Sequence, residues 1–227
     1  MTSTLFLGFV ALMTTFVVAL IARYINRRIA LGVLAGLFVW FLYVGLVEHF
    51  GILSNSEMRP PGIAFIVGPV LFFLVFFVVR PSASARGVLS FPLWLILGTQ
   101  CYRVGVELFL HQLWIEGLVP RMLTFAGANV DIYMGLSAPL IAWLSTGGRW
   151  GLKLAYAWNI LGLLALLNVV TRAVLTAPGP LNLIHAEVPD RMIGTFPFLL
   201  IPGFFVPLAV VLHVLAIRSI RVSLAKA

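Results

Sequence analysis

The chain has 227 residues, of which 62% are hydrophobic and 10% are charged. Soluble domains carry about 25% charged residues, so this chain lacks the polar surface that a domain surrounded by water needs. Its net charge is +8, but nucleic-acid binding requires a solvent-facing basic surface, which the short breaks between its apolar runs cannot form. Composition therefore predicts one transmembrane domain over residues 1–227, in contact with the lipid bilayer and with no nucleic-acid partner.

The first apolar run is Leu5–Ala22. No basic residue precedes it, and Arg23, Arg27 and Arg28 follow it. A secretory signal has the opposite order, with its positive charges before the apolar run. We therefore expect a first membrane helix that is retained.

Six more apolar runs follow, most of them close to the length of about 20 residues that crosses a bilayer core as a helix. Turn-forming residues separate the runs, as in Pro60-Pro61-Gly62 and Pro178-Gly179-Pro180. The pattern predicts an all-α fold, a bundle of seven transmembrane helices. The six runs are Ile29–Val47, Ile63–Val79, Val88–Leu110, Ile132–Ser145, Leu152–Leu175 and Phe196–Ile217.

If successive runs cross the membrane in alternate directions, the basic and the acidic residues fall largely on opposite sides of the membrane. Ten of the fifteen basic residues then fall on one side, and all seven acidic residues fall on the other side or in its half of a run. The basic side is cytoplasmic by the positive-inside rule, which places the N-terminus outside and the C-terminus in the cytoplasm. We expect the membrane to be a bacterial inner (plasma) membrane. The ten basic residues are Arg23, Arg27, Arg28, Arg80, Arg86, Arg149, Lys153, Arg218, Arg221 and Lys226; the acidic residues are Glu48, Glu57, Glu107, Glu116, Asp131, Glu187 and Asp190.

Arg103 and Glu107 in the fourth run, and His111 directly after it at the outer interface, are spaced four residues apart and so share one helix face. Ionisable groups within a membrane span are costly and are by default candidates for function. Counted from Val88 at 1.5 Å per residue, Arg103 lies roughly 22 Å into a core ~30 Å thick, in the outer half. An Arg–Glu pair at this spacing can neutralise itself within the helix.

Further polar residues are expected at the same level. Asp131 precedes the fifth run, and Asn168 and Arg172 share a face near the outer end of the sixth. Together with the fourth run they predict a ligand-binding site in the outer half of the bundle. A purely structural interpretation competes with it, in which Arg172 extends to the interface and Glu107 only offsets Arg103. The predicted ligand-binding residues are Arg103, Glu107, His111, Asp131, Asn168 and Arg172.

A metal site is a weaker hypothesis. Glu107 and His111 can bind one ion, with His185 or Glu187 of the last outer loop completing the set. The sequence has no His-Glu-x-x-His motif, and two-ligand spacings arise easily by chance. A transmembrane bis-histidine haem is disfavoured, because His111 and His213 are expected near opposite ends of their helices.

In topology, seven helices with an outer N-terminus resemble microbial rhodopsins, which hold retinal as a Schiff base on a lysine of the seventh helix. The seventh run here contains no lysine, since the only lysines are Lys153 and Lys226, and this argues against such a retinal linkage. The outline is also similar to the small sugar transporters of three-plus-one-plus-three design, whose Pro-Gln motifs are absent from this sequence.

Three functions remain open at this point. The first is the binding or transport of a small polar or anionic ligand through the outer polar site. The second is an intramembrane enzyme that uses Glu107 or His111 as a general base, with or without a metal. The third is a non-catalytic subunit or scaffold that binds other subunits of a larger membrane complex. The sequence indicates no particular catalytic residue.

Overall fold

The computed structural model describes residues 1–53, 58–79, 91–178, 181–191 and 195–226, and this part of the chain consists of helices and turns without strands. Three charged residues used to predict the orientation, Glu57, Arg80 and Arg86, lie outside the described residues, as does Val88, where the fourth run was expected to begin.

Five of the helices are long and apolar enough to cross a membrane, and the prediction of an all-helical membrane protein is confirmed at that level. Two further apolar helices are shorter. Each of the seven predicted runs overlaps one of these helices. The long helices are α1 (Thr2–Tyr24), α2 (Arg27–His49), α5 (Leu93–Thr99) continued by α6 (Tyr102–Ile115), α8 (Gly148–Thr176), and the π-helix η4 (Ile201–Phe205) continued by α9 (Val206–Lys226); the shorter ones are α3 (Ala64–Phe73), continued by the π-helix η1 (Leu74–Val79), and α7 (Asp131–Leu144).

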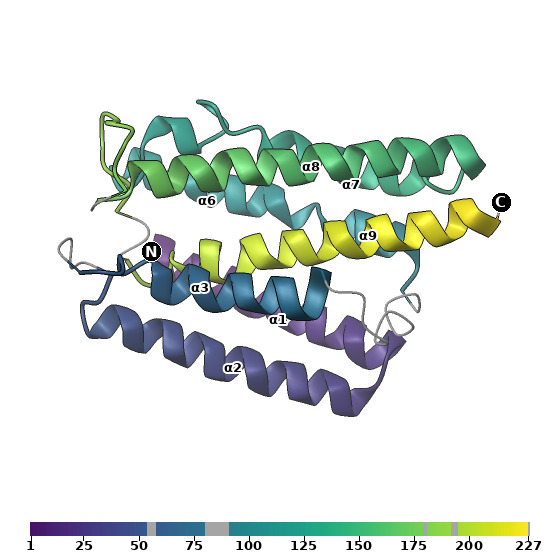
Figure 1. Ribbon diagram of the computed structural model, residues 1–227, viewed down its shortest axis with the longest axis horizontal. Coiled ribbons are helices and arrows are strands. Elements are labelled where there is room, and N and C mark those ends of the chain that lie inside the picture. The colour runs from purple at the N-terminus through teal and green to yellow at the C-terminus, as the bar shows by residue number, and fades with distance from the viewer. Residues whose placement is uncertain (54–57, 80–90, 179–180, 192–194, 227) are drawn as a thin grey trace.

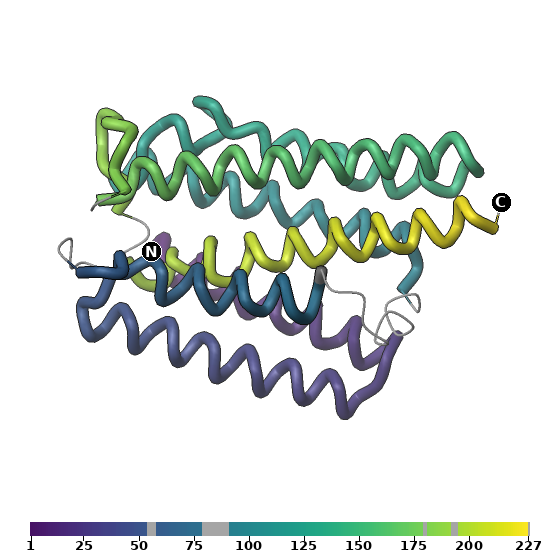
Figure 2. Tube along the Cα trace, in the orientation of Figure 1, coloured from purple at the N-terminus to yellow at the C-terminus, as the bar shows by residue number. Residues whose placement is uncertain are grey.

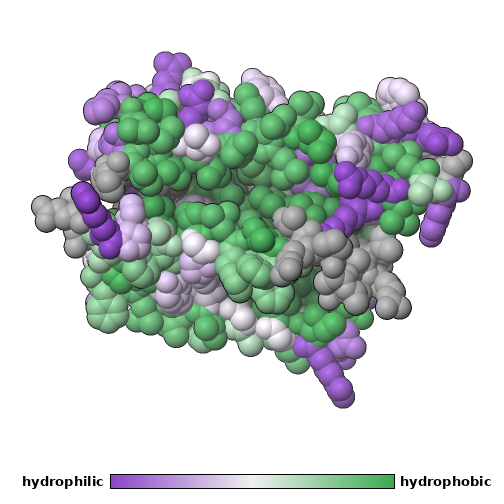
Figure 3. Space-filling model, in the orientation of Figure 1, coloured by the Kyte–Doolittle hydropathy of each residue, from purple (hydrophilic) through white to green (hydrophobic). Residues whose placement is uncertain are grey.

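The helices lie side by side along the long axis of the molecule, and the two chain termini lie at opposite ends (Figure 1). The N-terminus shares its end with the connections α2–α3, α6–α7 and α8–η4, as the trace in Figure 2 shows. The turns α1–α2 and α7–α8 lie at the other end, with the C-terminus. Hydrophobic residues cover the middle of the visible face, and hydrophilic residues gather toward its two ends (Figure 3). This is the surface expected of a bundle that crosses a bilayer.

The last helix begins later than predicted, at Ile201 rather than Phe196. Proline has no N–H and disrupts a regular helix, and three prolines, Pro197, Pro202 and Pro207, stand in this segment. Pro207 cannot donate to the carbonyl of Gly203, four residues earlier. The indole Nε1 of Trp40 on α2 donates to that oxygen instead, at 2.8 Å. A side chain from another helix thus satisfies a backbone group that proline leaves unpaired, as a membrane interior requires.

The core has two parts. One is rich in aromatic residues, and in it Phe6 of α1 packs against Phe109 of α6 and Phe205 of η4, with ring centroids 5.2 and 5.8 Å apart. The other lies among α5, α7, α8 and α9, and its buried side chains include small ones such as Ala138 and Ala155. Small side chains let helices approach closely, so polar groups on these helices can reach one another.

Candidate functional site

Arg103 is buried, with 2% of its surface exposed. It lies ten residues after Leu93 and twelve before Ile115 in the span Leu93–Ile115. At 1.5 Å per residue these are ~15 and ~18 Å, so Arg103 lies near the middle of its helix rather than in the outer half. The expected depth was too great because the helix begins at Leu93, not at Val88.

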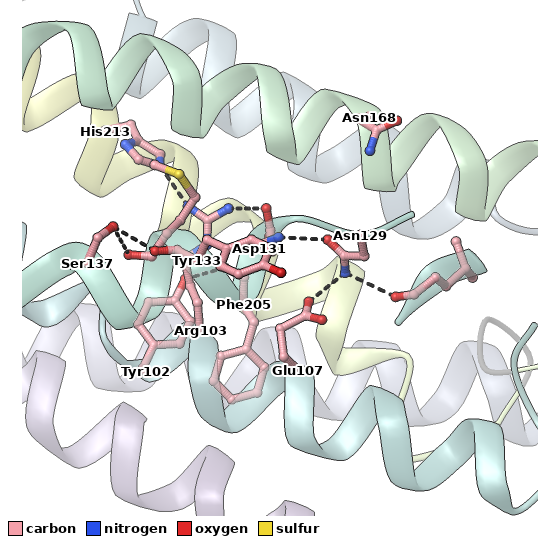
Figure 4. A network of polar contacts seen from close by, with 12 residues as sticks. Tyr102, Arg103, Glu107, Asn129, Asp131, Tyr133, Ser137, Asn168, Phe205 and His213 are labelled. Atoms are coloured by element: carbon pink, nitrogen blue, oxygen red, sulfur yellow. Dashed lines mark hydrogen bonds and ion pairs between the residues drawn. The ribbon is translucent and has the colours of Figure 1, made fainter. Parts of the chain in front are cut away.

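The guanidinium of Arg103 contacts two partners from other helices (Figure 4). Its Nη2 forms an ion pair with Asp131 Oδ1 at the start of α7, at 2.5 Å. Its Nη1 lies 2.9 Å from Nε2 of His213 on α9. Arginine has no acceptor, so it must donate, and Nε2 of His213 must carry no proton. The imidazole is therefore the neutral tautomer with its proton on Nδ1.

The tautomer of His213 agrees with its other contact. Nδ1 lies 2.8 Å from Oδ1 of Asn159 on α8, which can only accept. The Asn159 amide in turn donates to the carbonyl of Ala155 at 2.7 Å. Both His213 and Asn159 are fully buried. One directed chain of hydrogen bonds therefore joins Asn159, His213 and Arg103 across three helices.

Two glycines allow this close approach. A Cβ at Gly162 on α8 would overlap the imidazole of His213, and a Cβ at Gly135 on α7 would lie 2.8 Å from Val104 of α6. Neither position has room for a larger residue unless its neighbour moves. Gly162 thus makes the space that the His213 ring occupies, and Gly135 lets α7 bring Asp131 next to Arg103.

Glu107 is also buried, at 2% exposure, but its partner is an amide rather than the guanidinium. Asn129 donates to Glu107 Oε1 at 2.5 Å and to the carbonyl of Leu123 at 3.0 Å. The Asn129 oxygen accepts from the backbone N–H of Asp131 at 3.0 Å. Asp131, not Glu107, is thus the ion-pair partner of Arg103, and Asn129 links the Glu107 carboxylate to the backbone N–H of Asp131.

The remaining predicted residues lie around this network. Asn168 donates to the carbonyl of Ala128 at 3.2 Å and accepts from Nε of Arg172 at 2.8 Å. These two residues thus join α8 to the loop that carries Asn129. His111 is half-buried and stacks on Phe125, with ring centroids 4.6 Å apart. The structure therefore brings together Arg103 and Asp131 directly and Glu107 through Asn129, with Asn168 and Arg172 beside their loop.

The candidate metal ligands of the last outer loop do not converge on Glu107 and His111. Glu187 is exposed and accepts from the backbone N–H of Arg121 at 2.6 Å. His185 is exposed as well. Among the described residues, no group of three or more His, Cys, Asp or Glu side chains could hold a metal ion.

His213 and Asn159 were missed as members of the site. The signal available for them was the presence of a polar side chain within each of two mostly apolar runs, Leu152–Leu175 and Phe196–Ile217. His213 was assigned to the inner end of its helix. In the span Ile201–Lys226 it stands twelve residues from one end and thirteen from the other, so it lies at the middle, level with Arg103.

Several buried polar atoms of this site have no hydrogen-bond partner among the described residues. They are Nε of Arg103, Oε2 of Glu107 and both amide atoms of Gln100. The three residues stand at i, i+3 and i+7, which places them on one face of the α5–α6 helix. An unpaired buried polar group costs about 1–3 kcal/mol, so this face favours a partner that offers both donors and acceptors.

The helix is irregular at the same place. Between α5 and α6 the N–H of Arg103 donates to Gln100 O at 3.2 Å, and that of Val104 to Cys101 O at 3.1 Å. These bonds span three residues rather than four. A tightened stretch within a helix often marks a functional position.

A family model with the description Domain of unknown function (DUF8737) matches residues 60–221. The matched stretch is 162 of the 227 residues (221 − 60 + 1) and includes every residue of the polar network. No curated protein and no solved structure matches the chain.

Proposed function

For this chain, which belongs to the family Domain of unknown function (DUF8737), we propose a role as a seven-span membrane protein that binds or transports a small polar or anionic ligand at Arg103. The observation that supports this proposal is the buried, permanently charged side chain of Arg103 at the middle of its helix. Its Nε has no partner among the described residues. An ionisable residue at this depth is by default functional.

The distances along α8 support the membrane placement. Lys153 and Arg172 are 19 residues apart (172 − 153) in this helix. That separation is ~28 Å at 1.5 Å per residue, close to the ~30 Å thickness of a bilayer core. Each cation would then lie at one boundary of the core.

The two shorter helices complete seven spans in this proposal. α7 is preceded by a loop whose residues Leu123 and Asn129 are buried, so protein rather than lipid surrounds its polar backbone. The end of the bundle with the C-terminus faces the cytoplasm, because it carries most of the cations, and the membrane is the bacterial inner membrane.

The site can bind a ligand without losing its own ion pair. A guanidinium has five N–H donors in a planar fork. In Arg103, Nη1 donates to His213 and Nη2 forms the ion pair with Asp131. The edge of the guanidinium at Nε therefore remains available. An anionic or acceptor group of the ligand would bind at this edge. A donor of the same ligand would bind at Oε2 of Glu107, one helical turn away.

Thermal unfolding of the purified, detergent-solubilised protein with a panel of small carboxylates, organic phosphates and amino acids tests this proposal. A compound that binds only the folded protein, at 100 times its Kd, adds about 2.7 kcal/mol of stability. We expect at least one such compound, and we expect its effect to be lost in Glu107→Gln and in Arg103→Lys, which keeps the charge but not the fork.

Glu116→Gln is the matched control, because it makes the same change at an exposed position just after α6. It should respond as the wild type does. If no compound in the panel stabilises the protein, or if Glu107→Gln responds fully, the site assignment is wrong.

A further inference from the structure

A cavity of about 290 Å³ lies between α8 and α9, near the end of the bundle that carries the C-terminus. Lys153 and Tyr156 line it from α8, and Arg221 and Leu224 from α9. In each helix the two residues are three apart, so each pair lies on one face. The cavity is separate from the Arg103 network, none of whose residues line it.

Arg221 is held in place at this cavity. Its Nη2 donates to the hydroxyl of Tyr156 at 2.9 Å, and its Cζ lies 5.7 Å from the centroid of the same ring. Both contacts orient the guanidinium across the gap between the helices. An arginine fixed in this way loses less conformational entropy when it binds an anion.

The positive charge of the cavity is not compensated within its helices. α8 and α9 contain no Asp or Glu. In the part of the chain that the structure describes, neither Lys153 nor Arg221 forms an ion pair. Two cations therefore converge on a small space, and an anion is the complementary ligand.

The place of the cavity in the bundle indicates which anion. Lys153 marks one boundary of the ~28 Å stretch of α8 that matches a bilayer core. Tyrosine is enriched at this level, where its ring meets lipid and its hydroxyl meets water. Leu224 adds an apolar wall. Basic pockets between membrane helices suit the head groups of anionic lipids.

We propose that Lys153, Tyr156 and Arg221 form a binding site for the phosphate group of an anionic phospholipid. The volume of about 290 Å³ is at the lower end of small-ligand pockets, about 300 Å³, and suits a head group whose acyl chains remain in the bilayer. Arg221 and Lys153 bind the phosphate oxygens, and Leu224 completes the lining of the site.

Native mass spectrometry of the detergent-solubilised protein, titrated with dioleoylphosphatidylglycerol or dioleoylphosphatidylcholine, tests the site. At about 1 kcal/mol for each basic residue near the membrane surface, the double variant Lys153→Gln/Arg221→Gln should bind phosphatidylglycerol roughly 30-fold more weakly. The wild type should prefer phosphatidylglycerol to phosphatidylcholine. Tyr156→Phe, which releases Arg221, should show a smaller loss.

Arg27→Gln/Arg28→Gln is the control, because it removes two exposed cations at the same end of the bundle but outside the cavity. Its affinity should stay within a factor of about two of the wild type. Equal losses in both double variants would overturn the proposal, since binding would then be nonspecific attraction to surface charge. An unchanged affinity in the cavity variant, Lys153→Gln/Arg221→Gln, would overturn it as well.

A second arm distinguishes the source of the phosphate. Inorganic phosphate is titrated against the lipid-free protein, and thermal unfolding is measured. If it stabilises the wild type and not the cavity variant, while phosphatidylglycerol binds both equally, the ligand is a soluble phosphate and the lipid assignment is wrong. No effect of inorganic phosphate, together with cavity-dependent lipid binding, supports the lipid.

Discussion

The substitution Gly162→Ala separates two opposite expectations. Alanine favours a helix interior over glycine by about 1 kcal/mol, so helix propensity alone predicts a more stable protein. The structure predicts the reverse, because the new Cβ would overlap the His213 ring and would lie 3.0 Å from Met134 Cε.

The magnitude follows from what His213 would lose. Overpacking a core costs about 1–3 kcal/mol. Displacing the ring also breaks its bond to the charged Arg103, and a hydrogen bond to a charged group contributes about 1.5–3 kcal/mol. After the propensity gain, we expect a net destabilisation of about 2–5 kcal/mol. For a chain of this size each kcal/mol lowers Tm by about 2–4 °C.

Thermal unfolding in detergent measures the effect. Gly36→Ala on α2 is the control, because nothing lies within 4 Å of a Cβ there, and it should leave Tm unchanged or raise it. In a His213→Ala background the cost of Gly162→Ala should largely disappear, since the obstructing ring is gone. A Gly162→Ala variant as stable as the wild type would refute the packing of α8 against α9 described above.

Three further outcomes follow from other contacts. Trp40→Phe leaves the Gly203 carbonyl without its donor, so the free energy of unfolding should fall by about 1–3 kcal/mol, and a wild-type Tm would contradict this. Asn129→Ala removes a hydrogen bond from Glu107 and one from the backbone at the start of α7. It should destabilise the fold by a similar ~1–3 kcal/mol and weaken ligand-induced stabilisation, and a wild-type response to ligand would contradict this. Hydrogen bonds from the Thr2 hydroxyl and, to a smaller extent, from the Gln112 amide lower the pKa of Glu116 below that of a free glutamate. The ionised carboxylate therefore stabilises the fold at any pH above the pKa of the unfolded chain. This stabilisation is lost as the pH falls through the lower pKa of the folded protein. Thr2→Val should therefore raise the pKa measured for Glu116 by NMR and reduce the acid-induced fall in Tm, and an unchanged pKa would rule out the contact.

The sequence was sufficient to locate the helices and part of the site. The long apolar runs required helices, because only a helix satisfies its own backbone in lipid. Arg103 and Glu107 were recognisable because charged residues are rare in such runs, and Asp131 because it directly precedes one. Their pairing was not, because the ion pair of Arg103 with Asp131 depends on how closely α6 and α7 approach at Gly135.

The positions of Arg103 and His213 along their helices were misjudged for a related reason. Each of their helices begins five residues later than expected, at Leu93 instead of Val88 and at Ile201 instead of Phe196. Each shift is ~7.5 Å along the helix axis. The two helices run in opposite directions, so the shifts bring Arg103 and His213 toward each other. Pro197 and Pro202 disfavour a regular helix at the start of the later run, which the hydrophobicity of the run does not reveal.

The bond between Trp40 and Gly203 has a consequence for how this chain can be divided. Gly203 lies within the stretch that the family model matches, residues 60–221, whereas Trp40 precedes it. The ring of Phe6, from α1, also packs against Phe205 in that stretch. A fragment cut at the family boundary would leave the kinked start of the last helix without its indole donor and aromatic cover. The two helices before the matched region thus supply contacts to its last helix, and we expect a fragment of residues 60–221 to be less stable than the whole chain.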